Sequence, residues 1–322
     1  MLFGITPREW GDYFEDALKQ IKAAEETGFD SVWFEEHHEH PTYLPSPLLA
    51  LSSVMGHTKL RLGTNIIILP LHNPYQLAEE ISQLDCSSHG RLIIGLAAGY
   101  REKDFRNYGV SLEDRGRLMD ESVSLLEDLL SKEHVSHKGK YFQIQDATIQ
   151  PRPFQKPHPP IWIGGWKKPA LKRAALLGDA WFPGPTASFD QVLDAKEFYS
   201  SQISRLGKKM QGLPIMRDIY VAESTDNAFR ESKASFEYMY GEDYSSSEHP
   251  LLGGKHLSFE EWAKDRFIIG DPEVAIKEIE NYRKHGFSYM VLRVSLRKLT
   301  CDQITSSIRL IGEKVLPNFQ KE

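Results

Sequence analysis

Six consecutive ionisable residues follow a short run of bulky apolar residues near the N-terminus. The run is VWF at 32–34, which favours a β-strand, and the residues after it are Glu35, Glu36, His37, His38, Glu39 and His40. An imidazole titrates near pH ~6.5, so it exchanges protons readily at neutral pH. We interpret the cluster as a lone catalytic imidazole at the end of a buried strand, flanked by groups that orient it.

Two other interpretations of this cluster are open. Surface loops are often charged, so the six residues also fit an ordinary solvated loop. His38 and His40 resemble a chelating pair, but a hydrolytic metal site needs further ligands from other strand ends. The other histidines considered are His134, His137, His249 and His256. They fall in an expected insertion and a late loop, so we expect no bound metal.

Three further apolar runs end in small, aromatic or uncharged residues. They are GTNIIILPLHNP at 63–74, GLAAGYREKDF at 95–105 and IGGWKKP at 163–169. A broad planar cofactor needs surfaces of this kind, whereas a metal cluster needs carboxylates or imidazoles. These stretches therefore favour a planar cofactor, and we include Tyr100 among its expected contacts.

The third of these stretches also has the residues of an anion site. Gly164, Gly165 and Trp166 offer backbone N–H groups at the start of an expected helix, and Lys167 or Lys168 adds a positive charge. Exposed lysines at a helix N-terminus oppose the helix dipole by roughly 0.3–1 kcal/mol each, and a bound phosphate reverses that sign. A solvated helix start whose lysines point into water is the alternative that these residues leave open.

Short apolar runs alternate with amphipathic helical patterns along the chain, and these elements must position the chemical stretches. The expected strands lie at 2–5, 30–34, 60–69, 91–99, 160–165, 179–182, 213–222 and 288–294. The expected helices lie at 12–28, 46–58, 73–90, 112–132, 168–178, 189–206, from about 225, at 271–286 and at 301–319. Repeated strand–helix units imply parallel strands joined by right-handed crossovers.

Eight such units in 322 residues predict an α/β fold, a single (β/α)8 TIM barrel domain over residues 1–322. A hairpin insertion is expected at 135–153, after the fourth helix, and a long loop is expected before the eighth strand. An open doubly wound sheet is the alternative, but the chain has no GxGxxG fingerprint. The carboxyl ends of barrel strands meet at one mouth, so the stretches described above are expected to meet there.

The composition is that of an ordinary globular protein, with 40% apolar and 26% charged residues. A net charge of −6 argues against a nucleic-acid partner, which usually requires a basic face. Only two cysteines, Cys86 and Cys301, are present, which fits a reducing compartment. Because we see neither a signal-peptide pattern nor about 20 consecutive apolar residues, we expect a soluble cytoplasmic protein without membrane contact.

Four stretches resemble the bacterial luciferase-like flavin-dependent monooxygenase family. They are FDSVWFEEHHEH at 29–40, the block from LRLGTN to FRNYG at 60–109, PIWIGGWKKPALKRAALLGDAWFP at 160–183 and IGDPEVAIKEIENYRKHGFSYMVLR at 269–293. The resemblance keeps its order over nearly the whole chain. It implies a (β/α)8 barrel that binds FMN or a deazaflavin coenzyme at the mouth.

The activity implied by the resemblance is that of an oxidoreductase acting on paired donors. Reduced FMN would come from a separate flavin reductase, and one oxygen atom of O2 would enter a small organic substrate through a flavin C4a-peroxide. The resemblance does not identify that substrate. A deazaflavin-dependent hydride-transfer enzyme and a flavin-binding protein without turnover are the alternatives.

The resemblance also assigns roles to particular residues. His37 matches the family's catalytic histidine, and Asn65 falls where the family has a bulge with a cis peptide beneath the flavin ring. Gly164, Gly165 and Trp166 fall at the strand end that holds the phosphate.

Ala97 and Ala98 match positions where bacterial luciferase has a reactive cysteine and a phosphate-binding arginine. Both functional groups are missing here, so light emission is not expected. The charge of the missing arginine is expected from Lys167 or Lys168.

Two further expectations concern assembly and access to the mouth. The family usually forms dimers through the helices after strands 2 and 3, here about 46–56 and 74–88. Their apolar side chains suggest spare surface for a homodimer: Leu48, Leu51, Met55, Leu77, Ile81 and Leu84. Residues 242–262 are rich in Ser and Gly, and we interpret them as a lid over the substrate, with a disordered surface loop as the alternative.

Overall fold

The computed structural model describes residues 1–8, 13–40, 43–210, 212–244, 248–255 and 257–320. The strands of its main sheet are β1 (Leu2–Thr6), β2 (Ser31–Phe34), β3 (Arg61–Thr64), β4 (Ile67–Ile68), β5 (Leu92–Ala97), β8 (Ile161–Ile163), β9 (Ala180–Trp181), β10 (Pro214–Val221), β11 (Ile268–Gly270) and β12 (Tyr289–Arg293). They pair in the order β11-β10-β12-β1-β2-β3-β5-β8-β9, with β4 also on β5. Every pairing in this sheet is parallel among the described residues.

The sheet curls until its ends meet. The backbone N–H of Met216 in β10 donates to the carbonyl of Pro183, just after β9, at 3.0 Å. Strands β2, β10 and β12 are buried at every position, as expected for strands covered on both faces. The (β/α)8 barrel expected from the sequence is therefore confirmed.

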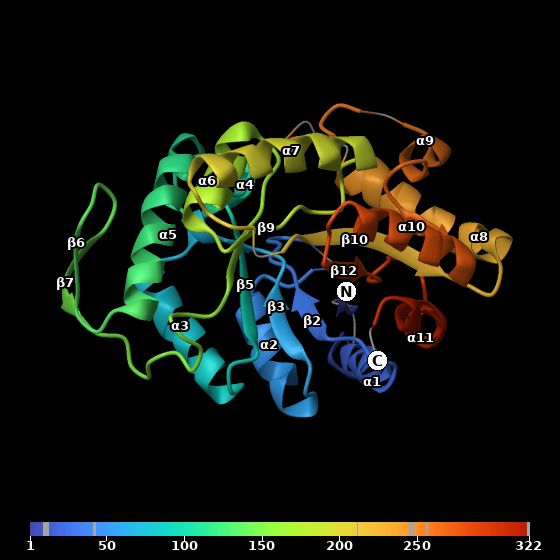
Figure 1. The fold of residues 1–322 in the computed structure, drawn as a ribbon, viewed down its shortest axis with the longest axis horizontal. Helices are drawn as coiled ribbons and strands as arrows, with labels where there is room; N and C mark the ends of the chain where they lie inside the picture. The colour runs from blue at the N-terminus through green and yellow to red at the C-terminus, as the bar shows by residue number, and fades with distance from the viewer. Residues whose placement is uncertain (9–12, 41–42, 211, 245–247, 256, 321–322) are drawn as a thin grey trace.

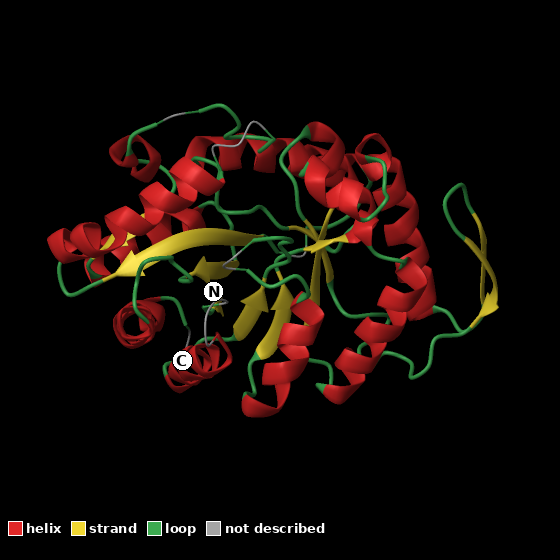
Figure 2. Cartoon of the chain, turned by 180° about the vertical axis from the view of Figure 1, so that it is seen from behind, coloured by secondary structure: helices red, strands yellow, loops and turns green. Residues whose placement is uncertain are grey.

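Helices surround the strands, as Figures 1 and 2 show. They are α1 (Tyr13–Glu26), α2 (Pro47–Val54), α3 (Pro74–Ser87), α4 (Glu102–Asn107), α5 (Arg115–Ser131), α6 (Lys168–Leu177), α7 (Phe189–Arg205), α8 (Thr225–Tyr238), α9 (Phe259–Ala263), α10 (Pro272–Lys284) and α11 (Cys301–Leu310). The chain ends lie close together, and the N-terminal ammonium of Met1 donates to the carbonyl of Phe319 at 3.0 Å. None of the described helices is both long and apolar enough to cross a membrane.

The third expected strand is interrupted in its middle, where β3 ends and β4 begins. The Asn65–Ile66 peptide between them is cis, as expected. The Thr64 side chain bridges to β5 here, since its Oγ1 donates to the carbonyl of Gly95 and accepts from the Gly95 N–H. A Cβ at Gly95 would lie only 2.1 Å from the Thr64 carbonyl oxygen, so this close approach requires glycine.

The expected hairpin insertion is present as β6 (Val135–Lys138) and β7 (Gln143–Ala147), which pair antiparallel and project from the barrel (Figure 1). The long connection before the last barrel strand contains a π-helical turn (Met239–Asp243), α9 and β11. Neither α4, α9 nor β11 was expected, because elements of three to six residues are too short to show periodicity.

The apolar residues expected to offer a dimer surface on and next to α2 and α3 pack into the core of the barrel. Less than a tenth of each is exposed for Leu48, Leu51, Leu77, Ile81 and Leu84, and Met55 is half-buried. The inference that these side chains offer spare surface for a dimer is therefore wrong, because the monomer core already uses them.

Candidate active site at the carboxyl ends of the strands

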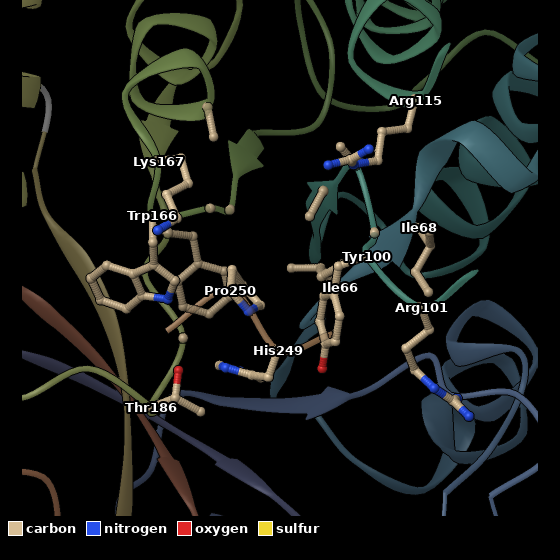
Figure 3. A pocket seen from close by; sticks show the side chains of 18 of the residues that line it. Ile66, Ile68, Tyr100, Arg101, Arg115, Trp166, Lys167, Thr186, His249 and Pro250 are labelled. Atoms are coloured by element: carbon tan, nitrogen blue, oxygen red, sulfur yellow. The ribbon is translucent and has the colours of Figure 1, made fainter. Parts of the chain in front are cut away.

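A cavity of about 520 Å³ opens at the carboxyl ends of the barrel strands (Figure 3). Nine of the expected site residues line it: His37, Asn65, Ala97, Ala98, Tyr100, Gly164, Gly165, Trp166 and Lys167. Lys168 does not, because its Nζ lies over the ring of Phe198, 5.5 Å from the centroid. Both lysines were candidates for a positive charge at the mouth. Of the two, Lys167 lines the cavity and Lys168 does not.

His37 enters the cavity from the loop after β2. Its Nε2 lies 3.2 Å from Glu35 Oε2, and its ring packs 4.2 Å from the ring of Tyr43. About a quarter (24%) of its side chain stays exposed, so the imidazole is oriented but accessible. This is the arrangement that a proton-transfer group needs.

His38 has a different environment, although it is the next residue. It is buried, and its Nε2 lies 2.8 Å from Glu36 Oε1. The Glu36 carboxylate also accepts from His72 Nε2 at 3.0 Å and from the backbone N–H of Ile68 at 2.9 Å. Burial by itself would raise the pKa of Glu36, but these hydrogen bonds outweigh it and lower the pKa to about 2. His38 therefore fixes the loop and does not face the cavity.

The low pKa of Glu36 makes the folded state sensitive to acid. The carboxylate stabilises the fold fully above its ordinary pKa of 4.5, and this contribution is lost as the pH falls from there towards about 2. We expect Glu36→Gln to lower the free energy of unfolding at pH 7 by on the order of 3 kcal/mol. Urea unfolding at pH 7, 5 and 3 measures this. A gap between wild type and variant that does not narrow at pH 3 would contradict the assignment.

A buried ion pair supports the floor beneath His37. The guanidinium of Arg293, at the end of β12, donates to Asp218 of β10 through Nε and Nη2. Tyr240 also donates to Asp218, and Arg293 Nη1 donates to the Tyr244 hydroxyl. The same Nη1 lies 3.8 Å from Oε2 of Glu35, the partner of His37. The network therefore ties the segment after α8 to the strand that carries the imidazole.

Removal of Asp218 should leave the fully buried Arg293 with only the more distant Glu35 carboxylate, 3.8 Å away, as a counter-charge. We expect Asp218→Ala to lower the free energy of unfolding by about 3–5 kcal/mol, the usual effect of breaking a buried pair. Thermal and urea unfolding measure the change. Asp302→Ala is the matched control, because its pair with Lys19 is exposed and should contribute nothing measurable. Similar losses of unfolding free energy in the two variants would contradict the expectation that the buried pair stabilises the fold more than the exposed one.

Two cations face the cavity without an acidic partner. Lys167 precedes α6 and Arg115 begins α5, and Figure 3 shows Lys167 on the left of the cavity and Arg115 on its right. Neither has a carboxylate within ion-pair distance among the described residues. Arg173 also lines this wall, but Asp120 accepts from its Nε at 2.5 Å. Both charges are therefore available to an anion in the cavity, although Arg115 Nη1 also donates to the carbonyl of Leu112 at 2.7 Å.

Arg115 and Arg173 were missed in the sequence because they lie in helices rather than at strand ends. A signal was present for Arg115, since a basic residue in the first turn opposes the helix dipole just as the lysines of α6 do. For Arg173, in the body of α6, no comparable signal exists.

The described side chains fit a flavin. The buried Oδ1 of Asn65 has no hydrogen-bond partner, while its Nδ2 donates weakly to Met216 Sδ at 3.6 Å. The imide N–H of a flavin ring is a suitable donor for that oxygen, and Ile66, Trp166 and Phe182 give the cavity apolar walls. No three acidic, His or Cys side chains gather as metal ligands do among the residues described.

The late segment contributes to the cavity wall through His249 and Pro250. The same segment buries Leu252 and Trp262 in the core, so its described part is packed against the barrel. Residues 245–247 and 256, which belong to the expected lid, lie outside the described residues. His249 was considered at the sequence level only as a metal ligand, and its place in the cavity was missed.

A family model for luciferase-like monooxygenases matches residues 4–289. The chain belongs to this family. A luciferase-like monooxygenase barrel therefore underlies the cavity, and the resemblance seen in the sequence is confirmed.

Relatives of this luciferase-like chain include more than one activity. The oxygenase component of a flavin-dependent trigonelline monooxygenase of Acinetobacter baylyi is 24% identical over 96% of this chain and 90% of its own length. An F420-dependent glucose-6-phosphate dehydrogenase of Microbacterium testaceum is 24% identical over 92% of this chain and 91% of its own. An uncharacterized protein of Sinorhizobium fredii is 35% identical over 169 residues, and the match spans about half (48%) of that protein.

The fold recurs in a solved structure of a monooxygenase from Streptomyces bottropensis. The two chains superpose with a TM-score of 0.89, cover 99% and 100% of each other, and are 24% identical. At this identity the likeness shows the fold alone, and the chemistry has to be argued from the cavity.

Proposed function

We propose that this chain is a monooxygenase that uses reduced FMN, supplied by a separate flavin reductase, to insert one oxygen atom of O2 into a small organic substrate. One observation carries the proposal. A single cavity combines an oriented, accessible His37, an unpartnered Asn65 oxygen and two unneutralised cations, Lys167 and Arg115. These are the contacts that the reaction centre, the ring and the phosphate of FMN require.

In this proposal FMN supplies, when bound in its reduced form, the electrons that activate O2. Asn65 Oδ1 accepts from the ring imide, while Lys167, Arg115 and the N–H group of Gly165 hold the phosphate. The Gly164 N–H takes no part, because it donates to the carbonyl of Leu96 at 2.8 Å. His37 donates or accepts a proton near the flavin edge, and Glu35 keeps its ring oriented. The apolar walls exclude water from the reacting groups.

Cofactor binding and turnover test the proposal directly. FMN titration followed by flavin fluorescence should show saturable binding. Photoreduced FMN with isotopically labelled O2 should convert an organic substrate into a product that carries one labelled oxygen atom, with the second atom leaving as water. Saturable binding without any oxygenated product across a broad substrate panel would favour a flavin-binding protein without turnover. Absence of FMN binding would overturn the proposal.

A deazaflavin-dependent hydride transfer is the second candidate, because the F420-dependent relative aligns over most of both chains. Titration with coenzyme F420 under the same conditions distinguishes the two. Tighter binding of F420 than of FMN, together with bleaching of its absorbance by an alcohol or sugar phosphate, would favour this candidate.

We also propose a homodimer, which rests on the family resemblance, and a cytoplasmic location, which rests on the low cysteine content. The buried side chains of α2 and α3 no longer support a dimer, although Leu49 on α2 is 73% exposed. Light scattering at micromolar concentration measures the oligomeric state.

A further inference from the structure

The imidazole of His249 is fixed in the cavity wall by its neighbours. Only 7% of the residue is exposed, and its ring packs edge-on against Tyr100 at 5.3 Å and against Tyr244 at 5.2 Å. Figure 3 shows His249 among the side chains around the cavity, below Lys167 and Arg115. The residue therefore has one well-defined orientation in the cavity wall.

Backbone hydrogen bonds determine which ring nitrogen of His249 carries the proton. The N–H groups of Leu251 and Leu252 donate to Nδ1 at 3.2 and 3.1 Å. Because Nδ1 is an acceptor, the proton of the neutral ring is on Nε2. Among the described residues Nε2 has no hydrogen-bond partner, so its N–H remains available to a molecule in the cavity.

The surroundings also keep this ring uncharged. Burial, followed by the nearby charge of Arg293, lowers the pKa of His249 to about 4. The titratable groups against the ring are the phenols of Tyr100 and Tyr244, and burial raises the pKa of Tyr100 to about 12. At neutral pH the ring is therefore a neutral donor among neutral phenols.

We propose that His249 is the residue that recognises the organic substrate, and that Nε2–H donates to an uncharged acceptor oxygen of carbonyl type. The assignment rests on the proposed function, because it needs a substrate beside the flavin. A hydrocarbon has no acceptor atom, so it would leave the Nε2–H without a hydrogen bond, which is unfavourable. A carboxylate would need a counter-charge, and the neighbouring Arg293 is already neutralised by Asp218.

The two cavity histidines thus have different roles. His37 is accessible and paired with a carboxylate, so it suits proton transfer. His249 cannot accept a proton at Nε2, since that nitrogen already carries one. It positions a substrate oxygen and selects compounds that have one.

Two-bond ¹⁵N–¹H correlation spectra of histidine-labelled protein test the assignment, with and without FMN, at pH 7. Cyclohexanone and methylenecyclohexane are the probes, since they share a shape and differ in the acceptor oxygen. We expect His249 in the neutral Nε2–H form and a shift of its Nε2 signal with cyclohexanone alone. A charged ring, an Nδ1–H form, equal shifts with both probes or no shift with either would overturn the proposal.

Variants at this position separate a hydrogen bond from simple packing. His249→Phe keeps an aromatic ring without a donor, and His249→Gln keeps an N–H near the position of Nε2. We expect cyclohexanone to bind roughly 3- to 10-fold more weakly to the Phe variant, and methylenecyclohexane to be unaffected. The Gln variant should recover part of the loss, and equal affinity in all three proteins would overturn the proposal.

FMN titration of the same proteins keeps the two proposals apart. If FMN does not bind to the wild type while the NMR result holds without it, the proposed function fails and the donor assignment stands. If FMN binds and supports oxygenation of a substrate while His249 does not respond to cyclohexanone, only the donor assignment fails.

Discussion

Replacement of His37 by alanine is expected to lower turnover at least ~10²-fold while leaving the fold and the affinity for FMN intact. The side chain is accessible at the cavity and contacts Glu35 and Tyr43. When the imidazole is removed, the buried Glu35 carboxylate keeps Arg293 as its counter-charge, with Nη1 3.8 Å from Oε2. The change should therefore appear in kcat rather than in stability. Single-turnover measurements with reduced FMN and O2, together with thermal unfolding, test both parts.

His38→Ala is the matched control for this prediction. His38 neighbours His37 in sequence, but it is buried against Glu36 and does not line the cavity. We expect this variant to lose stability, because Glu36 loses one of its hydrogen-bond partners, and to keep the chemical step in the folded fraction. A near-normal rate for His37→Ala, with a collapse of the rate for folded His38→Ala, would mean that the wrong imidazole was assigned.

Loss of the two free cations should weaken FMN selectively. Each charged hydrogen bond contributes roughly 1.5–3 kcal/mol, so Lys167→Ala and Arg115→Ala should each reduce FMN affinity by about 10- to 100-fold. Riboflavin lacks the phosphate and should bind both variants as it binds the wild type. The backbone N–H of Gly165 remains, so FMN binding should be weakened and not abolished.

Salt and a neighbouring lysine provide the controls for the anion site. FMN affinity should fall as ionic strength rises, since charge attraction at a partly exposed site is screened, and riboflavin affinity should not. Lys168→Ala should change neither the affinity for FMN nor its salt dependence, because the Nζ of Lys168 lies over Phe198 and not in the cavity. Calorimetry at two salt concentrations measures all these values. Equal losses for FMN and riboflavin would place the phosphate elsewhere on the mouth.

Gly165 is not a suitable position for testing this site, although the sequence suggests it. A Cβ there would lie 2.5 Å from the Cβ of Ala170, and the residue has a φ of +131°. A larger residue would disturb the start of α6 before it met any phosphate. Its effect on FMN could therefore not be separated from its effect on folding.

Local patterns in the sequence determined the barrel and the approximate place of the site. Helix-period spacing and continuous apolar runs are short-range signals, and they identified the strand–helix units correctly. Because barrel strands all end at one mouth, the order of the units was enough to gather His37, Asn65 and Gly164–Lys167 around one cavity.

Only the tertiary structure decided which way individual side chains point. Lys167 and Lys168 are equivalent in sequence, but the orientation of α6 turns one towards the cavity and the other onto Phe198. The same holds for α2 and α3, where Leu51 and Ile81 are buried in the core while Leu49 is exposed, a difference that depends on how each helix is oriented against the strands.

Local sequence patterns could not predict contacts between distant segments either. Arg115 reaches the cavity from the start of a helix, and His249 reaches it from a late segment more than 200 residues after His37. The proton position on His249 depends on two backbone N–H groups whose direction is set by the packing of that segment. Spacing within a sequence reports local conformation, whereas these features depend on how whole elements are oriented around a shared core.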